Sequence, residues 1–253
     1  MKFVPRTDAT AFAQSRLVTE YMARKSSFSA TGLIQARENL MSAGTAILSD
    51  AMGKTGAMDH DMRCWSARCQ MAGPAFTAKV HPADILMVGK ALSECPKDAV
   101  LVIDGQGELN TALWGGATTI AAGLKGLAGV VIDGAIRDLA EIRKETLPVF
   151  ARSVVPNAGG AEYPGELNIS IQCGGVVIHP GDWIVGDEDG VVVVPSTLLV
   201  NILEKARRLL EVEKAIYEEI RQGKDIATLL HYHELLDEKS KKSLLPQMRY
   251  LKK

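Results

Sequence analysis

Two short apolar runs on either side of a small-residue segment constrain the fold of this chain more than any other feature. Residues 100–104 and 129–134 are rich in Val and Ile and end in an acid or a glycine, which is typical of strands buried in a sheet. Residues 117–127 are small and apolar, as expected for a helix packed closely on that sheet. Strand, helix and strand in this order predict a βαβ unit. Residues 136–145 predict a further short helix.

The segments on either side of this unit show different residue patterns. Residues 1 to about 60 are predicted to be helical, with an apolar stripe at spacings of three and four over 29–52. After residue 149, three short apolar runs separated by turn sequences predict a β-rich half; they are 176–178, 183–185 and 191–194. Residues 197–222 predict a long amphipathic helix that ends at Gly223. The basic tail after Glu238 is expected to be solvated and partly mobile.

Composition excludes several classes of protein. The chain has 253 residues with 29 Lys and Arg against 30 Asp and Glu, so it lacks the basic excess of a nucleic-acid-binding domain. No apolar run reaches roughly 18 residues and the N-terminus lacks a signal-peptide core, so neither a membrane span nor secretion is expected. The 4 cysteines form no CxxC motif, which favours reduced thiols in a cytoplasmic protein. His231 and His233 lack the further ligands of a zinc site.

A glycine-rich segment follows the first apolar run. Asp104-Gly105-Gln106-Gly107 matches the start of a dinucleotide-binding turn, but Asn110 replaces the third glycine of GxGxxG. A nucleotide or S-adenosylmethionine site is therefore disfavoured. The alternative is a glycine-rich strand exit.

Two glycines, Gly115 and Gly116, open the predicted helix. The free N–H groups of such a helix end suit a carboxylate or a phosphate. The alternative is that both glycines serve close packing of the helix on the sheet.

Arg137 and Asp138 follow the second apolar run and precede a short helix. Ligands of open α/β sheets gather at the carboxyl ends of the strands. Here Asp138 suits a hard cation and Arg137 an oxyanion. A surface ion pair or a helix N-cap is the alternative.

Glu213 interrupts the apolar stripe of the long C-terminal helix between Leu209 and Ile216. A carboxylate on an apolar face is costly to bury without a partner. It is therefore expected either at the end of a subunit contact or in a site.

Taken together, these segments resemble the class II pyruvate aldolases that cleave 4-hydroxy-4-methyl-2-oxoglutarate, a family that includes the regulator of ribonuclease E activity A and is called RraA-like. The resemblance spans residues 40 to 223, and its most specific part is 134–138. Its other segments are 49–51, 73–75, 113–116, 126–133, 180–182 and 187–195.

The resemblance implies a swivelling β/β/α domain with N-terminal and C-terminal helical extensions, assembled as homotrimers or homohexamers with sites at subunit contacts. We expect an extension over 1–40, a catalytic core over 41–195, and a C-terminal helix and tail over 196–253. The resemblance also implies that Asp138 binds Mg²⁺ or Mn²⁺ and that Arg137 contacts the substrate and its developing oxyanion. The amides of Gly115, Gly116, Ala117 and Thr118 would hold the pyruvyl carboxylate, and Glu213 would reach a neighbouring subunit's metal-bound water.

One position departs from the family pattern. Many members carry an acid that holds a metal-bound water where this chain has Gly116. The sequence thus predicts a metal-dependent lyase that releases pyruvate from a small 4-hydroxy-2-oxo acid, with oxaloacetate decarboxylation as a second activity. The alternative is a non-catalytic protein that binds and inhibits a ribonuclease.

Overall fold

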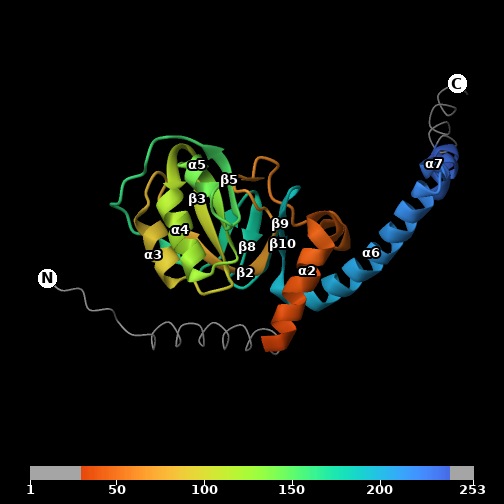
Figure 1. Ribbon diagram of the computed structural model, residues 1–253, viewed down its shortest axis with the longest axis horizontal. Coiled ribbons are helices and arrows are strands. Elements are labelled where there is room, and N and C mark those ends of the chain that lie inside the picture. Colours follow the sequence, from red (N-terminus) through yellow and green to blue (C-terminus); the bar gives the residue numbers. More distant parts are fainter. Residues whose placement is uncertain (1–29, 240–253) are drawn as a thin grey trace, which may run out of the picture. The chain divides into compact units, whose positions relative to one another are not determined.

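The computed structural model describes residues 30–239 of the chain (Figure 1). The chain divides into two compact units, Met1–Ala206 and Arg207–Lys253. Helix α6 (Leu199–Arg221) begins in the first unit and ends in the second, which also contains α7 (Ile226–Leu229). The helix expected before residue 30 and the basic tail beyond residue 239 lie outside the described residues.

A large mixed sheet forms the centre of the first unit. Its four middle strands are parallel neighbours, whereas the four outer strands pair antiparallel. The order is β1 (Arg63–Cys64), β5 (Val149–Val154), β4 (Gly129–Ile136), β3 (Val100–Trp114), β2 (Met71–Lys79), β9 (Trp183–Asp187) and β10 (Gly190–Val194), with β6 (Glu166–Leu167) beside β2. The predicted βαβ unit is confirmed as β3, α4 (Gly116–Lys125) and β4.

Alternating side chains of the parallel strands enter two separate cores. Ile103 and Ile132 face the helices α3 (Leu86–Glu94) and α4, and α5 (Leu139–Ile142) lies on the same side (Figure 1). Val102 and Val131 face the opposite way, toward β9, β10 and the hairpin of β7 (Ile171–Cys173) and β8 (Val176–Ile178). Helices, sheet and further strands therefore form the β/β/α layering that was predicted.

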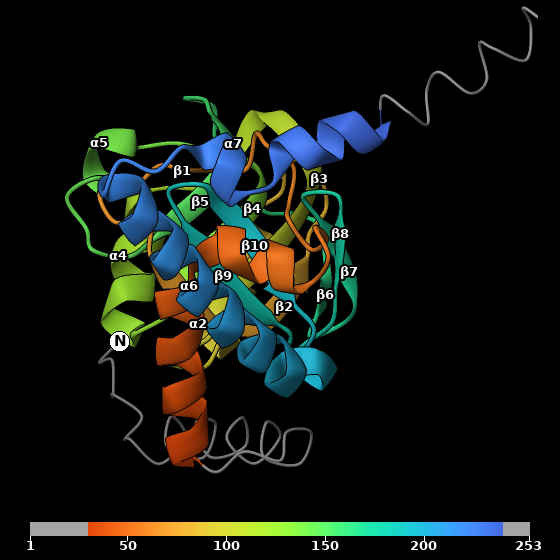
Figure 2. The same cartoon turned by 90° about the vertical axis from the view of Figure 1, so that its right-hand side faces the viewer.

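Helix α2 (Ala30–Ala51) packs against β9 and β10 (Figure 2). Gly44 (φ 73°, ψ 167°) breaks its helical conformation. Just beyond the break, Asp187 accepts hydrogen bonds of 2.7 Å from the backbone and from the hydroxyl of Thr45. The carboxylate caps the second half of α2, which explains why the predicted helical segment is bent.

Two elements differ from their predicted lengths. Strand β3 runs on to Trp114 rather than ending near Asp104, because Gln106 (φ 58°) and Gly107 (φ 73°) form a left-handed irregularity inside it. The glycine-rich segment is thus a bulge and opens no helix, which excludes the dinucleotide turn. Helix α5 covers only four residues, because Asp138 (φ 57°) is left-handed and cannot be helical.

The cysteines correct another expectation. Cys64 and Cys69, whose Cα atoms lie 5.7 Å apart, are joined in a disulfide, although all thiols were expected to be reduced. Their pairing depends on the turn between β1 and β2, which the cysteine spacing does not reveal. Cys95 and Cys173 are free and buried. Among residues 30–239, none of the helices combines the length and the apolarity needed to cross a bilayer.

Candidate functional site

The register of β3 and β4 brings two predicted site segments together. Trp114 and Ile136 are paired at the ends of these strands, and the Arg137 amide donates a 2.9 Å hydrogen bond to the Trp114 carbonyl. Gly115 therefore lies beside Arg137, at the carboxyl edge of the parallel strands. This is where ligands of α/β sheets usually bind.

Asp138 is held at the N-terminus of α4. Its Oδ2 accepts a 3.1 Å hydrogen bond from the Gly116 amide and lies 3.6 Å from Nε of Arg137. Both charged side chains are 44% exposed, so they remain accessible to a ligand. The positive end of the helix dipole and the guanidinium both attract this carboxylate.

Gly115 is required for steric reasons. A Cβ at this position would lie 2.6 Å from Oδ2 of Asp138 and 3.2 Å from Cγ of Arg137. Its backbone is extended, so the requirement comes from the space that the two charged side chains occupy. Any larger residue would displace Asp138.

Threonine side chains fix the start of α4. The Thr118 hydroxyl accepts a 3.0 Å hydrogen bond from the Gly115 amide, and Thr119 receives a 2.8 Å bond from the Trp114 indole. With Gly115 bonded to Thr118 and Gly116 to Asp138, two of the four amides predicted to hold a carboxylate already have partners. The amides of Ala117 and Thr118 lie in the first turn, where a helix provides no internal acceptors.

Glu141 contributes to this site, although the sequence did not single it out. A Cβ on Gly116 would lie 3.0 Å from Cβ and 3.5 Å from Cγ of Glu141. The Glu141 side chain thus fills the space above Gly116, and its carboxylate forms a 2.7 Å ion pair with Lys144. Its position three residues after Asp138, on a short helix, was the available signal.

The structure places Glu213 in the second unit, on α6. The residue is partly exposed, and its carboxylate accepts a 2.7 Å hydrogen bond from the Tyr217 hydroxyl. This bond raises the pKa of Tyr217. Glu213 is thus partnered within its own helix, and its predicted role at a neighbouring subunit's site stays a prediction.

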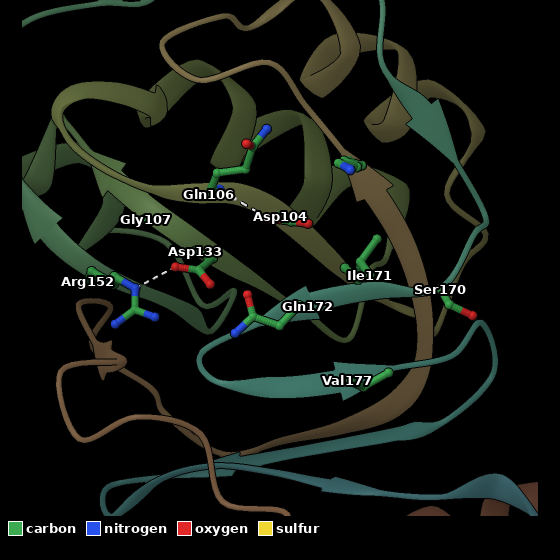
Figure 3. Close-up of a pocket in the computed structure, with 10 residues that line it drawn as sticks. Asp104, Gln106, Gly107, Asp133, Arg152, Ser170, Ile171, Gln172 and Val177 are labelled. Atoms are coloured by element: carbon green, nitrogen blue, oxygen red, sulfur yellow. Dashed lines mark hydrogen bonds and ion pairs between the residues drawn. The ribbon is translucent and has the colours of Figure 1, made fainter.

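A second polar cluster lies where the regular pairing of the parallel strands ends. Lys79, Asp104, Asp133 and Arg152 come from β2, β3, β4 and β5, and all four line one cavity (Figure 3). Asp104, Asp133 and Arg152 each come directly after the apolar run of their strand. That repeated pattern was visible in the sequence, but only the sheet order shows that the residues meet.

The mixed α/β fold and the helix-end site define a protein of the aldolase and RraA class. Residues 45–193 match the family described as RraA-like, Aldolase/RraA, and the chain belongs to this family.

Three relatives illustrate the match. An uncharacterised protein of Methanocaldococcus jannaschii is 41% identical over 160 residues, which cover 63% of this chain and 77% of the relative. The 4-hydroxy-4-methyl-2-oxoglutarate aldolase of Thermus thermophilus is 36% identical over 156 residues, which cover 62% of this chain and 94% of the relative. The solved structure of the RNA-processing inhibitor RraA from Thermus superimposes with a TM-score of 0.56 at 34% identity. The match covers 60% of this chain and 92% of that structure.

Proposed function

We propose that this chain is a divalent-metal-dependent carbon–carbon lyase that cleaves a small 4-hydroxy-2-oxo acid and releases pyruvate. The observation that carries the proposal is the placement of Asp138 and Arg137 against the N-terminus of α4. Aldolase names among the relatives support the reaction class. Oxaloacetate decarboxylation would use the same groups.

The residues present fit a hydrated divalent cation. Within residues 30–239, no three His, Cys, Asp or Glu side chains are grouped as a metal site, so Asp138 would be the single protein carboxylate on Mg²⁺ or Mn²⁺. Its Oδ2 accepts the hydrogen bond from Gly116 and lies at ion-pair distance from Arg137, so the carboxylate is held in place where it would bind the cation. Mg²⁺ suits such a site because it usually retains several waters. Bound there, the cation would polarise the 2-oxo group of the substrate as a Lewis acid.

The remaining groups divide the other tasks. The guanidinium of Arg137 stabilises negative charge that develops on the substrate oxygen as the bond breaks. The first-turn amides of Ala117 and Thr118 bind the substrate carboxylate, with the helix dipole adding to the attraction. We further propose a homotrimer or homohexamer in which Glu213 of one subunit orders water in the site of the next.

The test is pyruvate release from a panel of 4-hydroxy-2-oxo acids and from oxaloacetate, detected with lactate dehydrogenase. Activity should require Mg²⁺ or Mn²⁺, disappear with a chelator and return when the metal is restored. Asp138→Asn should abolish activity, whereas Asp189→Asn in an exposed turn should leave it unchanged. Full activity in excess chelator, or in Asp138→Asn, would contradict the proposal.

The second candidate is a non-catalytic inhibitor of a ribonuclease, which the likeness to the RNA-processing inhibitor RraA favours. Ribonuclease inhibition in the same preparations distinguishes the two. Inhibition that survives Asp138→Asn, together with no pyruvate from any substrate, would favour the inhibitor.

A further inference from the structure

The cavity where the regular pairing of the parallel strands is interrupted is separate from the Arg137–Asp138 site. It has a volume of about 590 Å³, and its lining includes none of the residues assigned to that site. Residues of β2 to β5 line one side of it, and the hairpin β7–β8 lines another with Ile171, Gln172 and Val177 (Figure 3). The volume lies within the range of small-molecule sites, which is roughly 300–1,000 Å³.

Three of the four charged residues face this cavity for a reason of sheet geometry. Val102, Val131 and Phe150 belong to the core beneath β7 to β10. Because side chains alternate along a strand, Asp104, Asp133 and Arg152, each two positions later, face the same way. A layer of charged side chains therefore borders the apolar core on this face of the sheet.

Two of these charges are neutralised within the protein. Arg152 donates through Nε to Asp133, through Nη1 to Asp61 at 2.6 Å and through Nη2 to Asp59 at 2.8 Å. The second oxygen of Asp133 accepts a 2.7 Å hydrogen bond from the Gly174 amide. Arg152 and Asp133 thus join the sheet to neighbouring loops, and their charges are not left for a ligand.

The other two charges, those of Asp104 and Lys79, attract each other but form no direct ion pair among residues 30–239. Asp104 is only 6% exposed and accepts a 3.1 Å hydrogen bond from the Gln106 amide, yet it forms no ion pair in the part of the chain that the structure describes. Burial raises the pKa of its carboxyl group, and the charge of Asp133 adds to the rise. Lys79, exposed at the rim, likewise has no ion-pair partner among residues 30–239.

Lys79 and Asp104 are placed to act on the same small molecule. They are register partners on neighbouring parallel strands, which lie about 4.8 Å apart. A ligand with only one charge would make a direct ion pair with one of these residues and be repelled by the other. A ligand with one positive and one negative group would satisfy both without adding net charge.

We propose that this cavity binds a small zwitterion, a free amino acid, whose ammonium group pairs with Asp104 and whose carboxylate pairs with Lys79. Ile171 and Val177 provide apolar contacts for its side chain, and Gln172 provides hydrogen bonds. The deep carboxylate then gains the cation that it lacks, which relieves the cost of its burial.

Isothermal titration calorimetry with the standard amino acids tests the proposal. For each binder, the matched amine without the carboxylate and the matched acid without the ammonium group serve as controls. We expect one or a few amino acids to bind, and both truncated analogues to bind on the order of 10- to 100-fold more weakly, the scale of a lost hydrogen bond to a charged group. No binding of any amino acid at millimolar concentration, or equal binding of an amine, would overturn the proposal.

Variants locate the binding. Asp104→Asn and Lys79→Gln should each raise Kd roughly 10- to 100-fold, whereas Lys90→Gln, an exposed position on α3, should not. Equal Kd values for Lys79→Gln and Lys90→Gln would overturn the assignment. This inference does not rest on the proposed lyase activity, because the cavity contains none of the residues assigned to the lyase site. Asp138→Asn should therefore retain the amino-acid affinity.

Discussion

The carboxylate of Asp138 accepts a hydrogen bond from the backbone amide of Gly116 at 3.1 Å. A residue that follows one strand thereby caps the helix that follows the neighbouring strand. Asp138 adopts a left-handed backbone conformation (φ 57°), which is costly for a residue with a side chain. Strain of this kind is typical of functional sites, and the cap orients the carboxylate beside Arg137.

Arg137→Lys is expected to lower kcat by on the order of 10²-fold, the effect of losing one oxyanion donor. Lysine keeps the charge but lacks the planar guanidinium fork. Steady-state pyruvate release measures the effect. Arg143→Lys, an exposed position just after α5, is the matched control. A near-normal kcat would assign Arg137 a structural role.

Gly115→Ala is expected to abolish activity, because the new Cβ would lie 2.6 Å from Oδ2 of Asp138 and would displace it. Gly123→Ala, in the same helix with no atom within 4 Å of the new Cβ, should instead keep activity. It should also raise the free energy of unfolding by about 0.5–1 kcal/mol. Urea unfolding and pyruvate release of both variants make the comparison, and an active Gly115→Ala enzyme would contradict the described site.

Asp104→Asn is expected to raise the free energy of unfolding at neutral pH. Burial and Asp133 raise the pKa of Asp104, with Lys79 opposing them, so the ionised form destabilises the folded state. The wild type therefore gains stability relative to Asn as pH falls through the raised pKa, and loses it as pH rises. Urea unfolding from acid to neutral pH should show a difference that shrinks toward low pH. A difference independent of pH would contradict the shift.

Glu213→Gln is expected to lower kcat by roughly 10- to 100-fold, as for groups that order metal ligands, while light scattering shows an unchanged trimer or hexamer. Tyr217→Phe removes the hydrogen bond to Glu213 but keeps its carboxylate, so it should retain more activity.

Mixed oligomers test whether the Glu213 site is shared between subunits. Arg137→Lys and Glu213→Gln chains, combined after confirmed subunit exchange, should regain part of the activity. No recovery, or a monomer at micromolar concentration, would refute a site built from two chains.

The sequence alone determined the parallel βαβ core. Residues 100–104 and 129–134 are apolar enough to require burial in one sheet, and the short helix between them allows only a parallel crossover. The carboxyl ends of these two runs must then be adjacent. The meeting of Arg137 with Gly115 depends in addition on the continuation of β3 to Trp114, which the sequence did not predict. Local pattern was sufficient for the βαβ core because neighbouring elements in sequence are also neighbours in space.

Only the tertiary structure decided the features that depend on distant pairings. Asp59 and Arg152 are 93 positions apart in sequence, and no periodicity links them. The left-handed conformation of Asp138, which shortens α5, is stabilised by a bond to a residue 22 positions away. The cavity charges converge because sheet order places β2 beside β3 and β5 beside β4. Such pairings are set by global packing, where burial and hydrogen bonding override local preference.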